Sequence, residues 1–455
     1  MLALGRITLP RGSLMKLSSA LLGAAAGIVA FGAAQAADLP MTKGEAVEYV
    51  KVCSAFGPGF FYIPGSDTCL KIGGEIRADY RVFGGNGFSR NDDRSAFNTQ
   101  GRIWFDARTE TEWGLLRSYF QINADSHKIS NQGRGAVYNS NTFSVDKAFI
   151  QFGGLTAGYA HSFFGFYDND YGNTIWAPYY AESNTVNLIA YTAQFGGGFS
   201  ATLSIEDGRD HALDSGFGAS GLPTTSLRGG QQIPDVVAQL RWDQSWGSVA
   251  VQAAAHQSRT AESVTITDPN DPTNTQTLGL DRSNKWGYAV GATGLIKLPF
   301  IDGGHFIVEG QYADGATDYL GAGNSFFGRS PGDLFITGTT PAGLAVVDRA
   351  KGWSIVAELG GNITPVLNAN LVGSYIDTKS ENILGAGVDT KVQEYTIAGN
   401  LTYTIVKGLT IGAEVAYTHG KVKNGLVYDT DAETLALQND SVNAWQAGIR
   451  LKRVF

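Results

Sequence analysis

The segment Val442–Phe455 alternates between apolar residues and polar or small residues, and it ends in an aromatic residue. Its apolar positions are Trp445, Ala447, Ile449 and Leu451. Such a strand is typical of the closing strand of an outer-membrane β-barrel, with Phe455 as the signal for the barrel-assembly machinery. Because every backbone N–H and C=O must be paired inside lipid, only a closed barrel lets a sheet cross a bilayer.

The same two-residue period recurs through nearly the whole chain. The first instance follows Lys71, where one set of alternate positions is apolar and includes Ile72, Ile76, Ala78, Tyr80 and Val82. The opposite set is charged. A soluble β-sandwich hides its apolar face and gives the same pattern, so the period alone leaves sandwich and barrel open.

Connection lengths favour the barrel. About sixteen strands are expected, near 71–83, 100–111, 116–126, 145–152, 155–161, 185–194, 198–206, 235–243, 247–257, 285–297, 303–313, 352–362, 367–377, 392–405, 408–420 and 442–455. Their connections alternate between short turns and long loops such as 162–184, 314–351 and 421–441. The sequence therefore predicts an all-β, transmembrane antiparallel β-barrel with short periplasmic turns and long extracellular loops.

Aromatic residues on the apolar faces support this choice, because they gather near the strand ends. Those bordering long loops are Tyr80, Tyr288, Tyr312, Trp353, Tyr375, Tyr417 and Trp445, and those bordering short turns are Phe199, Trp242, Tyr403 and Phe455. Two such girdles, one at each membrane interface, are typical of outer-membrane barrels.

The N-terminus predicts export. Residues 1–36 combine three basic residues, an apolar run and an Ala34-Gln35-Ala36 cleavage motif, with Met15 as an alternative start. A single-span anchor is the other interpretation. Removing the three basic residues would move the net charge from −8 to −11, and such an acidic chain is a poor nucleic-acid binder.

Residues 37–70 would form a periplasmic segment before the barrel, which we expect to span 71–455. This segment holds both cysteines of the chain, Cys53 and Cys69. In an oxidising compartment they are expected to form a disulfide. Two unrelated buried thiols are the alternative.

A barrel of this size has a wet interior, so its function depends on what narrows it. The third long connection, 162–184, is rich in aromatic residues and carries Asp168, Asp170 and Glu182. We expect it to fold inward as a constriction loop, because an exposed loop this aromatic would be a sticky patch. An ordinary external loop is the alternative.

The wall facing this loop would be basic. The first three strands carry Arg77, Arg81, Arg102, Arg108 and Arg117 at polar positions. Acids on one side of the channel and arginines on the other would set a field across the narrowest water. In a simpler interpretation, which is compatible with this one, the arginines pair with Asp79, Asp106 and Glu110 on these strands.

Nothing in the sequence indicates an enzyme, a cofactor or a metal site. The six histidines are scattered without metal-ligand spacing. Passive diffusion of small hydrophilic solutes and ions is the predicted function. An outer-membrane hydrolase with Ser, His and acid groups at the external rim, and a plugged adhesin-type barrel, remain as alternatives.

Three segments resemble one family, the alpha-proteobacterial general porins. Glu45–Cys53 with Gly59–Ile72 resembles its opening, Leu155–Phe164 the start of its constriction loop, and Ile449–Phe455 its closing strand. The resemblance implies a sixteen-stranded homotrimer in the lipid of the Gram-negative outer membrane. It also implies an infolded third loop, here with Asp168 and Asp170.

Overall fold

The architecture was obtained from a computed structural model of the 455-residue chain. The structure describes residues 51–455 except for 89, 91, 127–128, 131–136, 139–140, 214–225, 268–270, 272, 274, 328–331 and 430–433. The predicted leader, residues 1–36, and its alternative start at Met15 lie outside the described residues.

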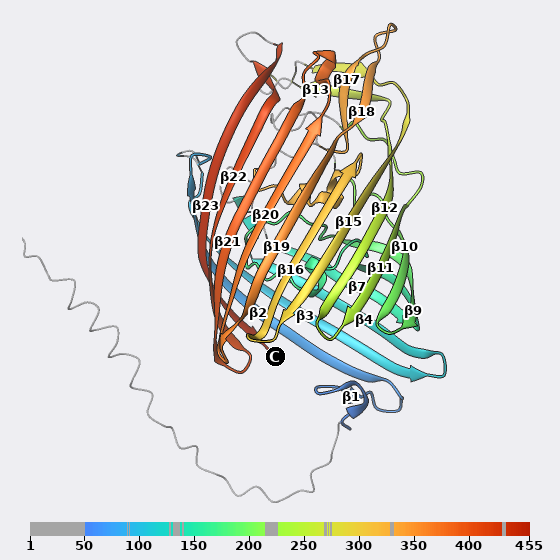
Figure 1. Ribbon diagram of the computed structural model, residues 1–455, viewed down its shortest axis with the longest axis vertical. Coiled ribbons are helices and arrows are strands. Elements are labelled where there is room, and N and C mark those ends of the chain that lie inside the picture. The colour runs from blue at the N-terminus through green and yellow to red at the C-terminus, as the bar shows by residue number, and fades with distance from the viewer. Residues whose placement is uncertain are drawn as a thin grey trace, which may run out of the picture. The chain divides into compact units, whose positions relative to one another are not determined.

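Sixteen antiparallel strands form a closed barrel (Figure 1). They are β2 (Cys69–Gly85), β3 (Ser95–Thr111), β4 (Gly114–Ser126), β7 (Thr142–Phe152), β8 (Leu155–His161), β9 (Thr185–Gly196), β10 (Phe199–Glu206), β11 (Asp235–Gln244), β12 (Gly247–Arg259), β15 (Asn284–Leu298), β16 (Asp302–Asp314), β19 (Lys351–Thr364), β20 (Leu367–Ser380), β21 (Thr390–Val406), β22 (Leu409–Asp429) and β23 (Thr434–Val454). Each strand pairs with its neighbour in the chain, and β23 pairs with β2 to close the ring. The predicted fold class is confirmed.

Shorter elements lie before the first barrel strand and in the connections between barrel strands. They are η1 (Ser54–Phe56), β1 (Phe61–Tyr62), β5 (Ile129–Ser130), β6 (Val137–Tyr138), α2 (Tyr167–Asp170), β13 (Ser263–Thr267), β14 (Thr275–Gly279), η2 (Thr317–Leu320), η3 (Ala322–Asn324), β17 (Leu334–Thr339), β18 (Ala345–Arg349) and η4 (Ile383–Gly385). Among the described residues, no helix is long and apolar enough to span a membrane.

The pleat of each strand separates two environments, as β2 illustrates. Ile72 and Ile76 point outward and are 46% and 49% exposed, whereas Glu75, Asp79 and Arg81 point inward and are buried. Since successive side chains alternate between the faces of a sheet, the wall is apolar outside and polar inside. This is the arrangement expected of a barrel whose outer face meets lipid.

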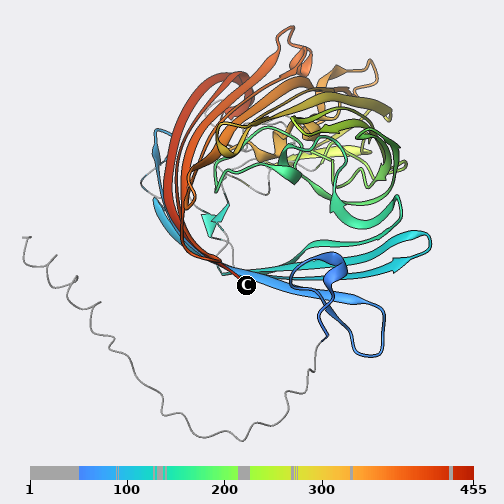
Figure 2. The same cartoon turned by 60° about the horizontal axis from the view of Figure 1, so that its bottom comes forward.

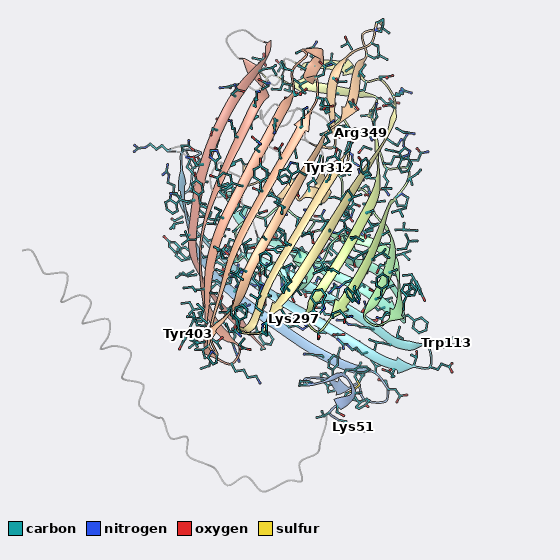
Figure 3. All side chains as sticks on the ribbon, viewed as in Figure 1. Lys51, Trp113, Lys297, Tyr312, Arg349 and Tyr403 are labelled. Carbon is teal, nitrogen blue, oxygen red and sulfur yellow. A yellow bond between two sulfur atoms is a disulfide. The ribbon has the colours of Figure 1, made fainter. Side chains whose placement is uncertain are left out.

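The aromatic girdles lie at the two ends of the wall. The Tyr312 ring lies 6.1 Å from the Tyr288 ring, at a tilt, toward the long-loop end, and Trp353 packs against Tyr375 at the same level. Figure 3 shows Tyr312 toward that end and Tyr403 at the opposite, short-turn end. Both interfaces predicted from the sequence therefore have their aromatic rings.

Phe455 takes part in closing the ring. Its N–H donates to the carbonyl oxygen of Gly74 at 2.9 Å, and the Gly74 N–H donates back to the Phe455 oxygen at 3.0 Å. The Phe455 ring lies over Gly74, where a Cβ atom would approach it to 2.5 Å. A side chain at position 74 would displace the ring, so the closing contact requires glycine there.

The disulfide predicted between Cys53 and Cys69 is present. It ties β1 and η1 to the start of β2, with Phe60 in the same buried cluster. Arg108 of β3 lies over the Phe60 ring at 4.9 Å. The disulfide lobe, residues 51–70, is therefore packed against the short-turn end of the first wall strands.

One predicted boundary is wrong. The connection expected over 421–441 is mostly strand, because β22 continues to Asp429 and β23 begins at Thr434. This hairpin extends past the neighbouring strands at the long-loop end (Figure 1). A register shift between Val422 and Gly425 interrupts the pairing, and the adjacent residues Gly425 and Leu426 are both buried. The sequence there therefore loses the regular two-residue alternation on which the prediction rested.

Candidate functional site: a loop inside the barrel

The connection between β8 and β9, residues 162–184, lies inside the ring of strands (Figure 2). We call it the inner loop. Its two ends meet where the Ser162 N–H donates to the Asn184 oxygen at 3.0 Å. A long loop whose ends are close and whose side chains pack internally is a compact unit rather than a free tether.

Inward-pointing glutamates hold the inner loop by its backbone. Glu309 of β16 accepts the N–H groups of Phe166 and Tyr167, both at 3.2 Å. Glu414 of β22 accepts three, from Ile175, Trp176 and Ala177, at 2.6, 2.7 and 2.8 Å. Hydrogen bonds donated to an ionised acceptor are roughly twice as strong as those between neutral groups.

Three further carboxylates extend this row. Glu206 of β10 accepts the Phe163 N–H at 3.2 Å. Glu358 of β19 accepts the Asn173 N–H at 3.0 Å and the Tyr167 hydroxyl at 2.9 Å. Glu394 of β21 binds the Tyr180 hydroxyl. The loop is thus held along half the wall, from β10 to β22.

The far end of the inner loop reaches the ring closure. Trp176 donates from its indole N–H to Asp79 of β2 at 3.0 Å, and Arg450 of β23 binds Asp79 through two bonds of 2.7 Å. The guanidinium groups of Arg81 and Arg450 lie 5.5 and 5.2 Å from the Trp176 ring, a distance at which cations are attracted to aromatic faces.

The three predicted loop acids have different surroundings. Asp168 binds the Tyr179 hydroxyl and lies 3.7 Å from His161 Nδ1. Asp170 belongs to α2, and its side chain is outside the described part of the structure. Glu182 is buried and accepts the Asn184 N–H at 2.7 Å, so it stabilises the base of the loop.

Asp168 is expected to make the channel sensitive to mild acid. Burial raises the pKa of its carboxyl to about 6, with Asp146 adding to the rise and Lys147 opposing it. The carboxyl is therefore mostly charged at pH 7.5 and mostly neutral at pH 5. One unit charge about 7 Å away changes local ion concentrations by a factor of about 3 in water.

We expect the reversal potential in a salt gradient to shift toward anion preference between pH 7.5 and pH 5. Asp168→Asn should remove most of this shift while preserving the shape of the loop. An equal shift in wild-type and Asp168→Asn channels would contradict the assignment and would point to another group facing the same water.

The predicted basic residues divide into two clusters. Arg77 pairs with Glu75, and Arg102 lies 3.5 Å from the same carboxylate while donating to Asn123 at 2.8 Å. Arg81 is buried against Gln446 and Trp176. Arg77 and Arg81 lie beside the inner loop, and Arg102 is linked to Arg77 through Glu75.

Arg108 and Arg117 form the second cluster. Both bind Asp106, with shortest distances of 2.7 and 2.8 Å, and Arg108 also faces the disulfide lobe. For this pair the simpler interpretation holds, since each arginine has a carboxylate partner. Asp79, expected as another partner of the predicted arginines, instead binds Arg450.

A basic cavity of about 380 Å³ lies between the inner loop and the wall. Its charged lining residues are Arg77, Arg450 and Lys452, and its loop residues are 172–175. Asn368, Asn370, Thr402 and Thr410 complete its polar lining. Arg77 and Arg450 each pair with one carboxylate, Glu75 and Asp79. The three lining cations therefore exceed these two carboxylates by one positive charge, which can attract an anion.

Sequence reasoning missed Arg450, Lys452 and the five glutamates. The available signal was weak, since each glutamate occupies one polar position on a different strand, namely β10, β16, β19, β21 or β22. Arg450 and Lys452 alternate with the apolar residues of the closing strand. They join the basic wall only because β23 pairs with β2, which brings Arg450 to Asp79 across 371 residues.

Comparison with known proteins gives one family. A family model described as "Porin subfamily" matches residues 38–446. Porin Omp2b of Brucella suis is 37% identical over 243 residues, which is 52% of this chain and 65% of that protein. Porin Omp2b of Brucella melitensis matches equally well. The alignment spans less than two thirds of these relatives.

A solved structure with a similar fold is the outer membrane channel DcaP of Acinetobacter baumannii. The TM-score is 0.55 at 15% sequence identity, and the match covers 87% of this chain and 99% of that chain. At this identity the likeness shows the fold alone.

Proposed function

Because this chain belongs to the porin subfamily, we propose that it forms a water-filled channel for passive diffusion of small hydrophilic solutes and ions. It is a protein of the Gram-negative outer membrane. The observation that carries the proposal is the inner loop, held against a polar wall by five carboxylates beside a basic cavity. Such a loop narrows the lumen without filling it by a separate domain.

Planar-bilayer recording tests this function. Purified protein should insert in discrete steps, each step adding an ohmic conductance that needs no ligand or energy source. A membrane that stays silent despite confirmed insertion of folded protein would contradict the proposal, and it would favour the plugged adhesin-type barrel.

One structural observation bears on the hydrolase alternative. His256 of β12 lies 2.8 Å from Asp235 through Nδ1 and 3.1 Å from the Ser258 hydroxyl through Nε2. This order of groups resembles a Ser-His-Asp triad. However, Ser258 and His256 have no exposed surface, and His256 also lies 3.6 Å from Asp333.

We therefore assign this triad-like array to holding the connection between β16 and β19, whose Tyr319 and Asp333 contact Asp235 and His256. No substrate carbonyl reaches the Ser258 hydroxyl while that connection is in place. Ester hydrolysis by the purified protein should equal that of Ser258→Ala. Activity that disappears in Ser258→Ala would restore the hydrolase alternative.

We also propose a homotrimer, on the support of family membership. The protein extracted in mild detergent should migrate as an oligomer before heating and as a monomer after boiling. If mild cross-linking of native outer membranes gave only monomer, the trimer would have to be abandoned, while the channel itself would not be affected.

A further inference from the structure

We propose that a second loop, formed by Gly315–Phe327 with Asp333, folds into the channel above the inner loop and acts as an outer size-selecting element. We call it the outer loop. It follows β16 and belongs to the connection that the sequence predicted only as a long external loop. The inference rests on the proposed channel function.

One end of the outer loop is fixed to β11 and β12. Tyr319, which is fully buried, donates to Asp235 at 2.8 Å and stacks on His211 at 4.2 Å. Asp333 accepts the Thr317 N–H at 2.8 Å. Because Asp235 and Asp333 both face His256, one buried charged cluster holds wall and loop together.

The other end of the outer loop reaches the ring closure. Ser325 and the Phe326 N–H donate to Glu394 of β21 at 2.8 and 2.7 Å. Phe326 and Phe327 are 2% and 8% exposed, although they lie in a connection. They pack in a cluster with Phe83, Phe88, Ala96, Val442 and Ala444, from β2, β3, β23 and the β2–β3 connection.

These two ends lie nearly opposite each other in the barrel. On one side of the ring, β11 and β2 are separated by β3, β4, β7, β8, β9 and β10, and on the other side by the remaining eight strands. Between these ends the segment follows the inner face of the wall, where the Leu320 carbonyl oxygen accepts the Ser354 hydroxyl of β19 at 2.8 Å. It therefore restricts the same water path as the inner loop.

The two loops also contact each other. Asn324 donates to the Ser183 hydroxyl at 3.0 Å, and Phe164 packs on Tyr319 with ring centroids 4.9 Å apart. Glu394 binds the Tyr180 hydroxyl of the inner loop as well as Ser325 of the outer loop. One carboxylate thus serves both loops, and movement of either loop disturbs the other.

At Gly321 the backbone of the outer loop lies directly against the backbone of the inner loop. The Gly321 φ of +70° lies in the left-handed region, and a Cβ atom there would come within 2.5 Å of the Ala181 carbonyl oxygen. The two backbones pack directly at this point. Any side chain at position 321 would therefore strain the turn and push the loops apart.

The decisive experiment compares three channels in bilayers and in liposome-swelling assays with sugars of increasing size. The first is wild type, the second replaces Thr317–Phe326 by a short Gly-Ser linker, and the third is Gly321→Ala. We expect the linker variant to show higher conductance and to admit larger sugars. Gly321→Ala should show the same change to a smaller degree.

A linker variant that conducts with wild-type conductance and sugar limit would overturn the inference and leave the channel function intact. If the linker variant does not fold, Gly321→Ala and a cross-link decide. Joining Asn324→Cys to Ser183→Cys with a short bifunctional thiol reagent should proceed in the conducting channel and preserve its current. Failure to cross-link, or loss of current on linking, would contradict the proposed contact.

Discussion

Replacing Glu414 by alanine is expected to raise the single-channel conductance and the current noise of the open channel. Glu414 is the acceptor for three successive backbone N–H groups of the inner loop. A buried donor left without its partner costs about 1–3 kcal/mol. Only the Ala177 N–H among the three donors is buried, so losing the carboxylate should weaken docking of the loop by about 1–3 kcal/mol, roughly a tenfold to hundredfold change in the undocked-to-docked ratio.

Two comparisons make this result specific. Glu414→Gln keeps one acceptor oxygen and should give an intermediate change. Asp125→Ala removes another inward acid, which binds Gln100 of the neighbouring strand and not the loop. It should leave the conductance unchanged. Equal conductances for Glu414→Ala and wild type would show that the loop does not need this carboxylate.

Neutralising Arg77 and Arg102 together is expected to shift ion preference toward cations. Five cations lie together in the inner basic cluster, Arg77, Arg81, Arg102, Arg450 and Lys452, and three carboxylates lie near them, Glu75, Asp79 and Glu414. Their formal charges leave a net charge of about +2. Each unit charge at about 7 Å changes local ion concentrations in water by a factor of about 3. The double variant should therefore change the cation-to-anion permeability ratio several-fold.

The reversal potential in a gradient of dilute salt measures this change, since screening is weaker at low ionic strength. Arg108→Gln with Arg117→Gln is the matched control. It removes the same charge, but from a pair that is bound to Asp106 near the disulfide lobe. An unchanged reversal potential in Arg77→Gln/Arg102→Gln would refute the role of the arginine wall.

The wall was predictable because it follows a simple rule. Each membrane strand has one face in lipid and one in water. Apolar and polar residues therefore alternate along the strand with a period of two. The rule fails where a register shift interrupts the alternation, as it does between Val422 and Gly425, and this explains the missed extension of β22 to Asp429.

The residues that hold the loops were less predictable. Glu309, Glu358 and Glu414 bind backbone N–H groups of the inner loop. Every residue except proline carries such a group, so the loop's sequence does not show which residues these glutamates bind. The outer loop was missed for a related reason. Phe326 and Phe327 are buried by strands from both ends of the chain, and this contact exists only after the ring closes.

One face of each wall strand lines water and the other meets lipid, and the rest of the interpretation depends on this arrangement. Asn368 and Leu371 of β20 test it as a pair, because Asn368 lines the basic cavity and Leu371 is 56% exposed on the outer face. The two native cysteines are bonded to each other, so no free thiol competes.

The measurement is the channel current before and after a charged, membrane-impermeant thiol reagent is added to Asn368→Cys and to Leu371→Cys. We expect a stepwise loss of current in Asn368→Cys and no change in Leu371→Cys. Loss of current in Leu371→Cys alone, or an Asn368→Cys channel that the reagent does not modify, would contradict this arrangement.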